Sequence, residues 1–362
     1  MSSRVGRKFV VSLFGQSHSA AVGCVVEGVP AGRAIDFADL RAFLARRAPN
    51  GAAYSTARKE TDAFEFVGGL VDGVTCGAPL AALIRNADAH SADYDQVRRM
   101  PRPGHADYVA RAKFGAAHDV AGGGHFSGRL TAPLCIAGGI AKQMLRLRGV
   151  EVGAHLARVA CIDDAPWPSQ GLAPDDVGRP GGKSFPVVDD DAGMRMRDAI
   201  AAARAAGDSV GGVVECAAVG LPIGVGEPIF DGIESALGRI LFGIPAVKGV
   251  EFGCGFAAAD MCGSVHNDPY RMRDGHVAFE SNNAGGILGG ISTGEPVMVR
   301  VAFKPTSSIF LEQRSVDLER GCNADLTLSG RHDPCVAVRA VPVVEAACAV
   351  ALYDLMSEAG LA

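Results

Sequence analysis

The sequence predicts an α+β fold, and three observations lead to this expectation. First, 48% of the 362 residues are hydrophobic and 21% are charged, so the chain can bury a sizeable core and is not a disordered polypeptide. Second, stretches with strand character and stretches with helix character follow one another without regular βαβ alternation, which disfavours a doubly wound sheet. Third, 47 Gly and 19 Pro residues without a G-X-Y period indicate many tight turns. The length alone allows one large domain or two.

Strands are expected where β-branched residues cluster. The stretch 297–303 alternates around Arg300, which is the period-two pattern of a strand. The four stretches are residues 9–14, 22–29, 213–219 and 297–303.

Apolar residues at helical spacing, together with terminal signals, predict five helices. Asp36 is expected to cap a helix whose apolar positions run from Leu40 to Leu44. A largely buried helix is expected over 129–148, closed by Gly149. The other three are expected over 194–206 before Gly207, over 232–242, and from Pro342 at the first helical position to Glu358 before Gly360.

Residues 163–191 interrupt this pattern of strands and helices. The stretch is polar and rich in Pro and Gly, so it is the best candidate for an excursion or linker. As a domain boundary the signal is weak.

The charge balance argues against a nucleic-acid partner. The formal net charge is −5 and the pI is about 6.0, whereas nucleic-acid-binding domains usually carry a basic excess. Any phosphate that the chain binds is then held locally. The basic residues are 7 Lys and 28 Arg, and the planar arginine side chain suits carboxylates and phosphates.

Neither metal binding, secretion nor membrane insertion is predicted. The ten cysteines form no C-x-x-C pair and no His/Cys cluster with zinc spacing, which fits buried reduced thiols in a cytoplasmic protein. Arg4, Arg7 and Lys8 precede an apolar stretch that ends at Gly15, too short for a typical signal peptide. The longest uncharged run, 281–294, is rich in Ser, Asn and Gly and is far shorter than the ~20 apolar residues of a spanning helix.

Five glycine-containing segments that also hold a polar or basic residue, and the lysine-containing segment KPTSS, are typical of an anion site. Glycines let backbone N–H groups approach an anion, and an adjacent Lys or Arg adds charge-assisted hydrogen bonds, so we expect a phosphorylated ligand. None of the segments is a P-loop, because G-x-x-x-x-G-K-[ST] is absent. The segments are GQSHS (15–19), RPGHADY (102–108), GGGHFSGR (122–129), SNNAGGILGGISTG (281–294), KPTSS (304–308) and GRHDP (330–334).

Each segment also has a purely structural interpretation. A single histidine such as His18 or His105 is more often a hydrogen-bonded structural residue than a catalyst. Single arginines are most simply solvated surface charges, Lys304 a charge at a strand end, and Asp333 a turn-former before Pro334. The joint occurrence of the segments favours a binding site.

Several long, distinct motifs are distributed along the whole chain. They are FGQSHSAAVGCVVEGVPAG, RRAPNGAAYSTARKETD, RPGHADY, DSVGGVVE with GLPIGVGEPIFD, IPAVKGVEFGCGF, SNNAGGILGGISTGEP, KPTSSI and GRHDPCVAVRAVPVVEA. With these motifs the sequence resembles the chorismate synthase family over nearly its whole length, as a divergent member.

This resemblance implies a single domain over residues 1–362, with helices packed between antiparallel β-layers, and a homotetramer. It also implies a lyase of the shikimate pathway of aromatic amino-acid biosynthesis. The reaction converts 5-enolpyruvylshikimate 3-phosphate to chorismate and phosphate by a 1,4-anti elimination. The family needs reduced FMN without net redox change, and NADPH is a candidate reductant.

Three catalytic roles are implied by the resemblance. His105 protonates the leaving phosphate, His18 protonates the reduced flavin, and Asp333 works near flavin N5 to accept the C6 proton. Histidine suits the first two roles because the pKa of an imidazole is close to neutral, and a carboxylate can shuttle a proton when a cation such as Arg331 adjusts its charge.

The resemblance also implies which residues bind the ligands. The arginines that match the family's anion-binding positions are Arg47, Arg58, Arg102 and Arg129. The matching FMN contacts are Ser127, Pro245, Ala246, Gly289, Lys304, Pro305, Thr306, Ser307, Ser308 and Arg331.

Several motifs depart from the usual family forms GESHG, RRRPG and GGGRSSARET. Here Gln16 and Leu130 each remove a carboxylate, Ala53 and His125 each remove a permanent cation, and Phe126 replaces a hydroxyl. Two hypotheses follow: a working enzyme with a remodelled site, or a paralogue that is a ligand-binding or tetramer-partner subunit or acts on a related phosphorylated cyclohexene acid. His125 faces either the ligands or the protein interior, where it would bond to backbone beside a core Phe126.

Overall fold

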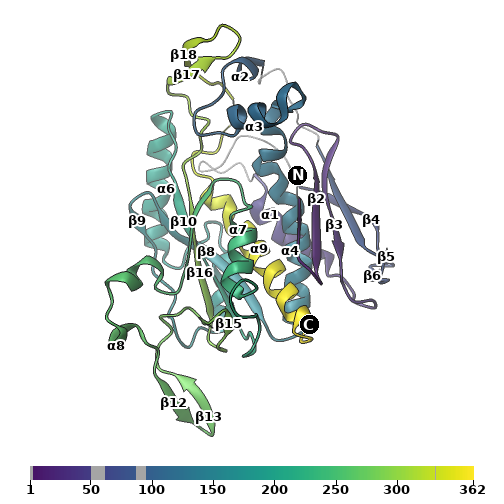
Figure 1. Cartoon of the computed structure of the whole chain (residues 1–362), viewed down its shortest axis with the longest axis vertical. Helices are drawn as coiled ribbons and strands as arrows, with labels where there is room; N and C mark the ends of the chain where they lie inside the picture. Colours follow the sequence, from purple (N-terminus) through teal and green to yellow (C-terminus); the bar gives the residue numbers. More distant parts are fainter. Residues whose placement is uncertain (1–2, 50–61, 87–94, 331) are drawn as a thin grey trace.

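Helices lie between two five-stranded antiparallel sheets (Figure 1). The computed structural model describes residues 3–49, 62–86, 95–330 and 332–362. Within these ranges the α+β prediction is confirmed, because strands pair antiparallel in both sheets and the helices pack on their facing sides.

The first sheet has the strand order β1-β2-β3-β7-β4. Alternate side chains of its central strand, Val22, Cys24 and Val26, are buried against the helical layer, so the period-two pattern of the sequence becomes one buried face. The strands are β1 (Arg4–Val5), β2 (Val10–Gly15), β3 (Ala21–Glu27), β7 (Leu80–Arg85) and β4 (Phe64–Gly68).

The second sheet has the order β11-β16-β10-β8-β9 and is covered on both faces. Val152, Ala154 and Leu156 belong to the main core, whereas Ala217 and Val219 pack in a separate cluster on the opposite face. The strands are β11 (Val247–Phe252), β16 (Val297–Phe303), β10 (Gly212–Val219), β8 (Glu151–Val159) and β9 (Ile162–Asp163).

The helical layer consists of α1 (Phe37–Arg47), α4 (Thr131–Arg146) and α9 (Ala337–Glu358). Two adjacent glycines of α4 allow its close packing. A Cβ atom on Gly138 would lie 2.2 Å from the Cβ of Ala346 on α9, and one on Gly139 would lie 2.4 Å from Leu40 Cδ1 on α1. Asp36 caps α1 as predicted, since its carboxylate accepts the N–H groups of Ala38 and Asp39.

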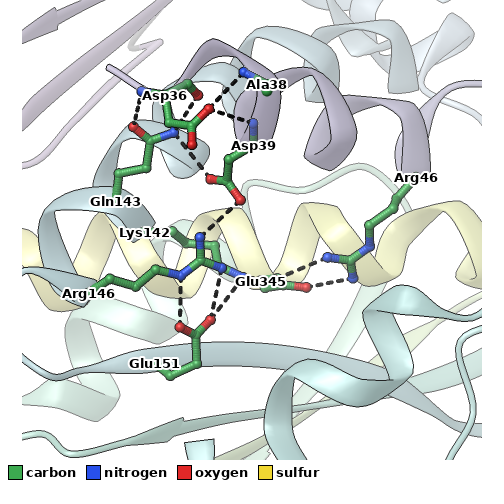
Figure 2. Close-up of polar contacts among 9 residues, drawn as sticks. All are labelled: Asp36, Ala38, Asp39, Arg46, Lys142, Gln143, Arg146, Glu151 and Glu345. Atoms are coloured by element: carbon green, nitrogen blue, oxygen red, sulfur yellow. Dashed lines mark hydrogen bonds and ion pairs between the residues drawn. The ribbon is translucent and has the colours of Figure 1, made fainter. Parts of the chain in front are cut away.

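A buried polar network crosses this layer (Figure 2). Glu345 of α9 accepts both a bidentate pair from Arg46 of α1 and an ion pair from Lys142 of α4. Lys142 also lies 3.7 Å from Glu151 of β8, and Arg146 of α4 donates two hydrogen bonds to the same carboxylate. Burial, with the nearby Arg46 charge, lowers the pKa of Lys142 to about 7. The network therefore fixes the mutual register of three helices and one strand.

Shorter elements lie around this frame. The remaining helices are α2 (Asp95–Arg99), α3 (Asp107–Phe114), α5 (Pro174–Gly178), α6 (Asp190–Ala205), α7 (Ile233–Leu241) and α8 (Gly263–His266). The two-stranded ribbons are β5 (Leu70–Val71) with β6 (Val74–Thr75), β12 (Tyr270–Arg273) with β13 (His276–Phe279), β14 (Ile287–Leu288) with β15 (Ile291–Ser292), and β17 (Gln313–Asp317) with β18 (Cys322–Leu326).

The predicted start of the C-terminal helix is wrong. Pro342 lies inside α9, which begins five residues earlier at Ala337. Proline removes one N–H donor from the helix interior, yet Ala337, Ala340 and Val341 are buried there, and this packing outweighs the lost bond. The helix expected at 194–206 likewise starts earlier, at Asp190, because Asp189 caps it. The helix expected at 129–148 spans Thr131–Arg146, preceded by a 3₁₀ turn over Gly128–Leu130.

The segment 163–191 covers the face of the second sheet that α9 does not touch. Trp167, Leu172 and Val177 are buried there against residues of β10 and β16. The polar residues of this segment therefore lie in exposed turns between the packed apolar residues.

Two further findings bear on the sequence predictions. All ten cysteines are free, but Cys76, Cys161, Cys262 and Cys322 are exposed, so the expectation of uniformly buried thiols is wrong. In the part of the chain that the structure describes, α9 alone is long and apolar enough to cross a membrane, and 94% of its apolar window is buried inside the fold. This helix therefore belongs to the hydrophobic core of the protein.

Candidate active site

A cleft of about 640 Å³ lies beside the helical layer. Six separate parts of the chain line it: Arg47 at the end of α1, residues 102–106, the glycine-rich turn at 122–131, residues 242–248 leading into β11, the end of β16 with the KPTSS turn, and residues 332–343 around the start of α9. Four of the six segments singled out in the sequence meet here, and only the tertiary structure brings them together.

The triple glycine of GGGHFSGR separates two histidines. Gly122, Gly123 and Gly124 all have positive φ angles, which glycine adopts without strain. A Cβ on Gly122 would lie 2.9 Å from His18 Nε2, and one on Gly123 would lie 3.2 Å from His105 Nε2. His105 lines the cleft, whereas His18 is half-buried behind Gly122 and is not among the cleft-lining residues.

A buried carboxylate holds two of the predicted arginines together. Asp62 forms ion pairs with both Arg47 and Arg129, and all three side chains are at least 96% buried. Burial by itself raises the pKa of Asp62, but the two guanidinium groups outweigh it and hold this pKa below its usual value. Arg47 also donates from Nε to Thr131 Oγ1 at 3.0 Å, and Arg129 from Nε to Asn86 Oδ1 at 3.0 Å. The heads of the arginines are therefore fixed before any ligand arrives.

The KPTSS turn forms the opposite wall. Lys304 donates to the carbonyl of Gly104, and burial together with the nearby Lys248 charge lowers the pKa of Lys304. Ser308 accepts a hydrogen bond from Arg102 Nη1 at 3.1 Å. Thr306 Oγ1 is buried and has no hydrogen-bond partner in the described part of the chain. A buried hydroxyl without a partner is costly, so this atom marks a place where a ligand would bind.

Asp333 is held by a residue that the sequence interpretation missed. Arg339, one turn into α9, donates from Nη1 to Asp333 Oδ2 at 2.7 Å and from Nε to the carbonyl of Arg47 at 2.9 Å. The signal was present in the sequence, because an arginine inside the apolar stretch AVRAVP needs a buried partner. Asp62 and Asp107 were not predicted as site residues either. Both lie in motifs, RRAPNGAAYSTARKETD and RPGHADY, in which only other residues were predicted to bind or react.

The remaining predicted residues are distributed as follows. Ser127, Pro245 and Ala246 line the cleft. Ala246 has a positive φ of 74°, and its carbonyl accepts a hydrogen bond from the backbone N–H of Lys304 at 3.0 Å. Gly289 lies in the β14–β15 turn and is not among the cleft-lining residues. Arg58 and Arg331 lie outside the described residues.

The two unusual residues of GGGHFSGR both line the cleft. His125 is nevertheless engaged by the protein, since its Nδ1 lies 2.9 Å from the carbonyl of Gly15 and its Nε2 2.8 Å from Ser3 Oγ. Phe126 is 37% exposed and packs near the rings of Phe114 and His118, so it forms part of the rim and not of a core.

The charge of the cleft suits an anionic ligand. Among the described residues, six Lys or Arg side chains line it against a single carboxylate, Asp333. The six are Arg47, Arg102, Arg129, Lys248, Lys304 and Arg339. Such an excess of fixed cations in a concave site attracts a ligand with several negative charges.

Comparison with known proteins decides the family. The family model described as chorismate synthase matches residues 9–357. The chain belongs to the chorismate synthase family. The curated chorismate synthase of Lancefieldella parvula is 43% identical, with 98% of this chain and 96% of that protein covered. The curated chorismate synthase of Korarchaeum cryptofilum is 46% identical, with 96% of each covered.

A solved structure supports the chorismate synthase fold independently. The structure titled "Crystal Structure of Chorismate Synthase" matches with a TM-score of 0.75 and 24% identity, covering 98% of this chain and 93% of that one. The fold expected from the resemblance, with helices between antiparallel layers, is therefore confirmed. As a member of the chorismate synthase family the chain is a lyase of aromatic biosynthesis.

Proposed function

We propose that the cleft converts 5-enolpyruvylshikimate 3-phosphate to chorismate and phosphate by 1,4-anti elimination with reduced FMN. The observation that carries the proposal is the meeting, in one cationic cleft, of His105, Asp333 and the Arg47–Arg129 pair. The substrate has a phosphate and two carboxylates, so convergent arginines supply the charge-assisted hydrogen bonds that it needs.

The residues present fit FMN. The Thr306 hydroxyl, which is buried and has no partner among the described residues, lies in one turn with the Lys304 ammonium. The Ala246 carbonyl hydrogen-bonds to this turn, and Ser127 lines the same cleft. When bound, reduced FMN supplies electron density to the allylic system as phosphate departs. The residues proposed to hold it are Ser127, Pro245, Ala246, Gly289, Lys304, Pro305, Thr306, Ser307, Ser308 and Arg331.

The residues of the chain perform the proton transfers and the binding. His105 donates a proton to the leaving phosphate. Asp333, whose carboxylate Arg339 holds in place, takes up the C6 proton. His18, behind Gly122, keeps the reduced cofactor correctly protonated. Arg47, Arg58, Arg102 and Arg129 bind the phosphate and carboxylates, and the Asp62 bridge holds two of these arginines in place before the substrate arrives.

An anaerobic assay tests this function. Purified protein with reduced FMN and 5-enolpyruvylshikimate 3-phosphate should form chorismate, followed by its absorbance. His105→Ala should lower kcat by about 10² or more, the range for a general acid, with FMN affinity nearly unchanged. The exposed His276→Ala is the matched control. Absence of chorismate with bound FMN would favour the altered-paralogue hypothesis, and a loss below threefold in His105→Ala would return His105 to a structural role.

The assembly and the cellular setting are part of the proposal. Ile223, Ile229 and Phe230 are each at least 70% exposed, and this apolar surface supports self-association into a homotetramer. Light scattering tests the tetramer through its mass. NADPH is the proposed reductant, tested by anaerobic bleaching of FMN in the presence of the protein. Ten free cysteines support a cytoplasmic location.

A further inference from the structure

His105 is held by a carboxylate that belongs to its own motif. Asp107, in the first turn of α3, places Oδ1 2.5 Å from His105 Nδ1, and its side chain is 98% buried. Arg102 contacts both oxygens of the same carboxylate, with Nη2 2.9 Å from Oδ1 and Nε 2.7 Å from Oδ2. The backbone N–H of Arg102 also donates to Oδ2 at 3.1 Å. The motif RPGHADY thus folds back on itself around one carboxylate.

This carboxylate is ionised and accepts from every neighbour. Burial by itself raises the pKa of Asp107, but hydrogen bonds from Arg102 and His105 outweigh it and hold this pKa far below its usual value. An ionised carboxylate only accepts hydrogen bonds, and all nitrogens of Arg102 only donate. His105 Nδ1 therefore carries the proton of its 2.5 Å contact with the carboxylate oxygen. The Arg102 Nη2 donor is farther from Nδ1, at 3.1 Å, and lies 3.4 Å from Nε2.

The proton on Nδ1 determines what the other ring nitrogen can do. Nε2 lies beside Gly123, where a Cβ atom would be 3.2 Å away, and the ring lines the cleft. With Nδ1–H directed at Asp107, a proton on Nε2 makes the ring an imidazolium, and its loss leaves the neutral Nδ1–H tautomer. The paired carboxylate stabilises the imidazolium and does not itself take the proton.

We propose that Asp107 is a positioning residue that fixes His105 in the Nδ1–H tautomer and directs Nε2 toward the leaving group. The inference rests on the proposed function, in which Nε2 gives its proton to a phosphate oxygen. The N–H bond at Nε2 breaks, an O–H bond forms on phosphate, and the ring ends as the neutral Nδ1–H form. Arg102 holds Asp107 in place, and Ser308 holds Arg102 through the 3.1 Å bond from Nη1.

A purely structural role for Asp107 makes a different prediction. In that case the carboxylate only pairs with Arg102 and closes the turn before α3, and the tautomer of His105 does not depend on it. The substitution Asp107→Asn separates the two roles. The amide oxygen would take the place of Oδ2, which accepts from Nε and the backbone N–H of Arg102, and the NH₂ group would take the place of Oδ1. The NH₂ group then faces Nδ1, which becomes an acceptor and moves the ring proton to Nε2, while Arg102 Nη2 loses its acceptor and must turn aside.

The primary measurement is magic-angle-spinning NMR of the full chain labelled with ¹⁵N-histidine at pH 8, with the His105 signals assigned by their loss in His105→Gln. The parent protein should show a protonated Nδ1 and an unprotonated Nε2. Asp107→Asn should exchange these two signals. Asp325→Asn, which removes an exposed carboxylate across the neighbouring surface hollow that His105 also lines, should leave them unchanged. A parent spectrum with a protonated Nε2 and an unprotonated Nδ1 overturns the proposal even if Asp107→Asn fails to fold.

Kinetics give the second measurement. Asp107→Asn should lower kcat by about 10² or more, because the defect appears when the proton moves, and FMN affinity should change less than threefold. KM should change by a smaller factor than kcat, through the loss of the Arg102 partner. Unchanged kcat in Asp107→Asn contradicts the inference while leaving the proposed function intact. A parent protein that forms no chorismate contradicts the proposed function, and the NMR result still decides the tautomer.

Discussion

Arg339 and Asp333 form an ion pair with 2.7 Å between Nη1 and Oδ2, where the chain enters α9. The same guanidinium donates to the backbone carbonyl of Arg47, so it links the GRHDP motif to the end of α1. The proposed proton acceptor is thus tied to the anion-binding wall by one side chain from the core helix.

Replacing Arg339 tests this link. Arg339→Gln should lower kcat about 10-fold to 100-fold, since a hydrogen bond to a charged group contributes about 1.5–3 kcal/mol. FMN affinity should change less than threefold. Arg300→Gln is the control, because Arg300 forms a similar pair with Glu251 at 2.9 Å but does not line the cleft. Equal losses in both variants would contradict a specific role for Arg339.

The Asp62 bridge should be a large contribution to stability. Asp62→Asn leaves the buried guanidiniums of Arg47 and Arg129 without their counter-ion, and we expect the free energy of unfolding to fall by about 3 kcal/mol. Asp72→Asn is a matched control, because Asp72 has the same φ of 50° but is exposed. Its effect should stay within about 0.5 kcal/mol. Urea unfolding measures both, and a loss below 1 kcal/mol in Asp62→Asn, about the value of one ordinary hydrogen bond, would contradict the prediction.

A buried histidine far from the cleft should make stability depend on pH. His155 lies between Asp164 (2.8 Å to Nδ1) and Glu215 (3.0 Å to Nε2). Burial by itself lowers the pKa of His155, but these two hydrogen bonds outweigh it and raise the pKa above 6.5. Because the folded pKa is the higher one, the stabilisation is complete below the unfolded value near 6.5 and is lost as pH rises through the folded value.

The test is urea unfolding between pH 6 and pH 9. His155→Gln should remove the part of the stability that is lost as the pH rises, because glutamine has no proton to lose. Lys142, whose pKa burial lowers to about 7, adds the opposite slope to both proteins, so the difference between the two slopes is what is measured. His276→Gln, at an exposed position, should retain the slope of the parent. An equally steep slope in His155→Gln would assign the effect to other groups.

Lys304 should bind FMN. Lys304→Ala removes the one cation of the KPTSS turn, and we expect the FMN dissociation constant to rise about 10-fold to 100-fold by the same charged hydrogen-bond range. Lys183→Ala, whose ammonium pairs with Asp190 on the other side of the second sheet, is the control. Fluorescence titration with FMN measures both, and an unchanged constant in Lys304→Ala would leave the turn with a structural role.

His125 should act through the fold and not through ligand charge. His125→Ala loses the contacts with Gly15 and Ser3, and we expect a loss of about 1 kcal/mol in stability. FMN affinity at pH 6 and pH 8 should be the same within threefold in the parent. Thermal melting and FMN titration check these points. Tighter FMN binding at pH 6 in the parent that disappears in His125→Ala would show that His125 faces the ligand.

Local signals in the sequence predicted the elements whose pattern is complete within one segment. The strand expected at 297–303 coincides with β16, and Asp36 caps α1, because alternation and capping depend on neighbouring residues only. The start of α9 was wrong since Pro342 is a strong local signal, which the burial of the preceding turn overrides.

For the candidate site, the sequence by itself singled out the four motifs that line the cleft and, through its resemblance, predicted the family. The tertiary structure alone decided which motifs meet: it placed His105, Lys304 and Asp333 around one cleft. It also supplied the partners Asp62, Asp107 and Arg339. The physical reason is that an ion pair in a core depends on the packing of segments far apart in the chain, such as α1 against α9, and no local pattern encodes that distance.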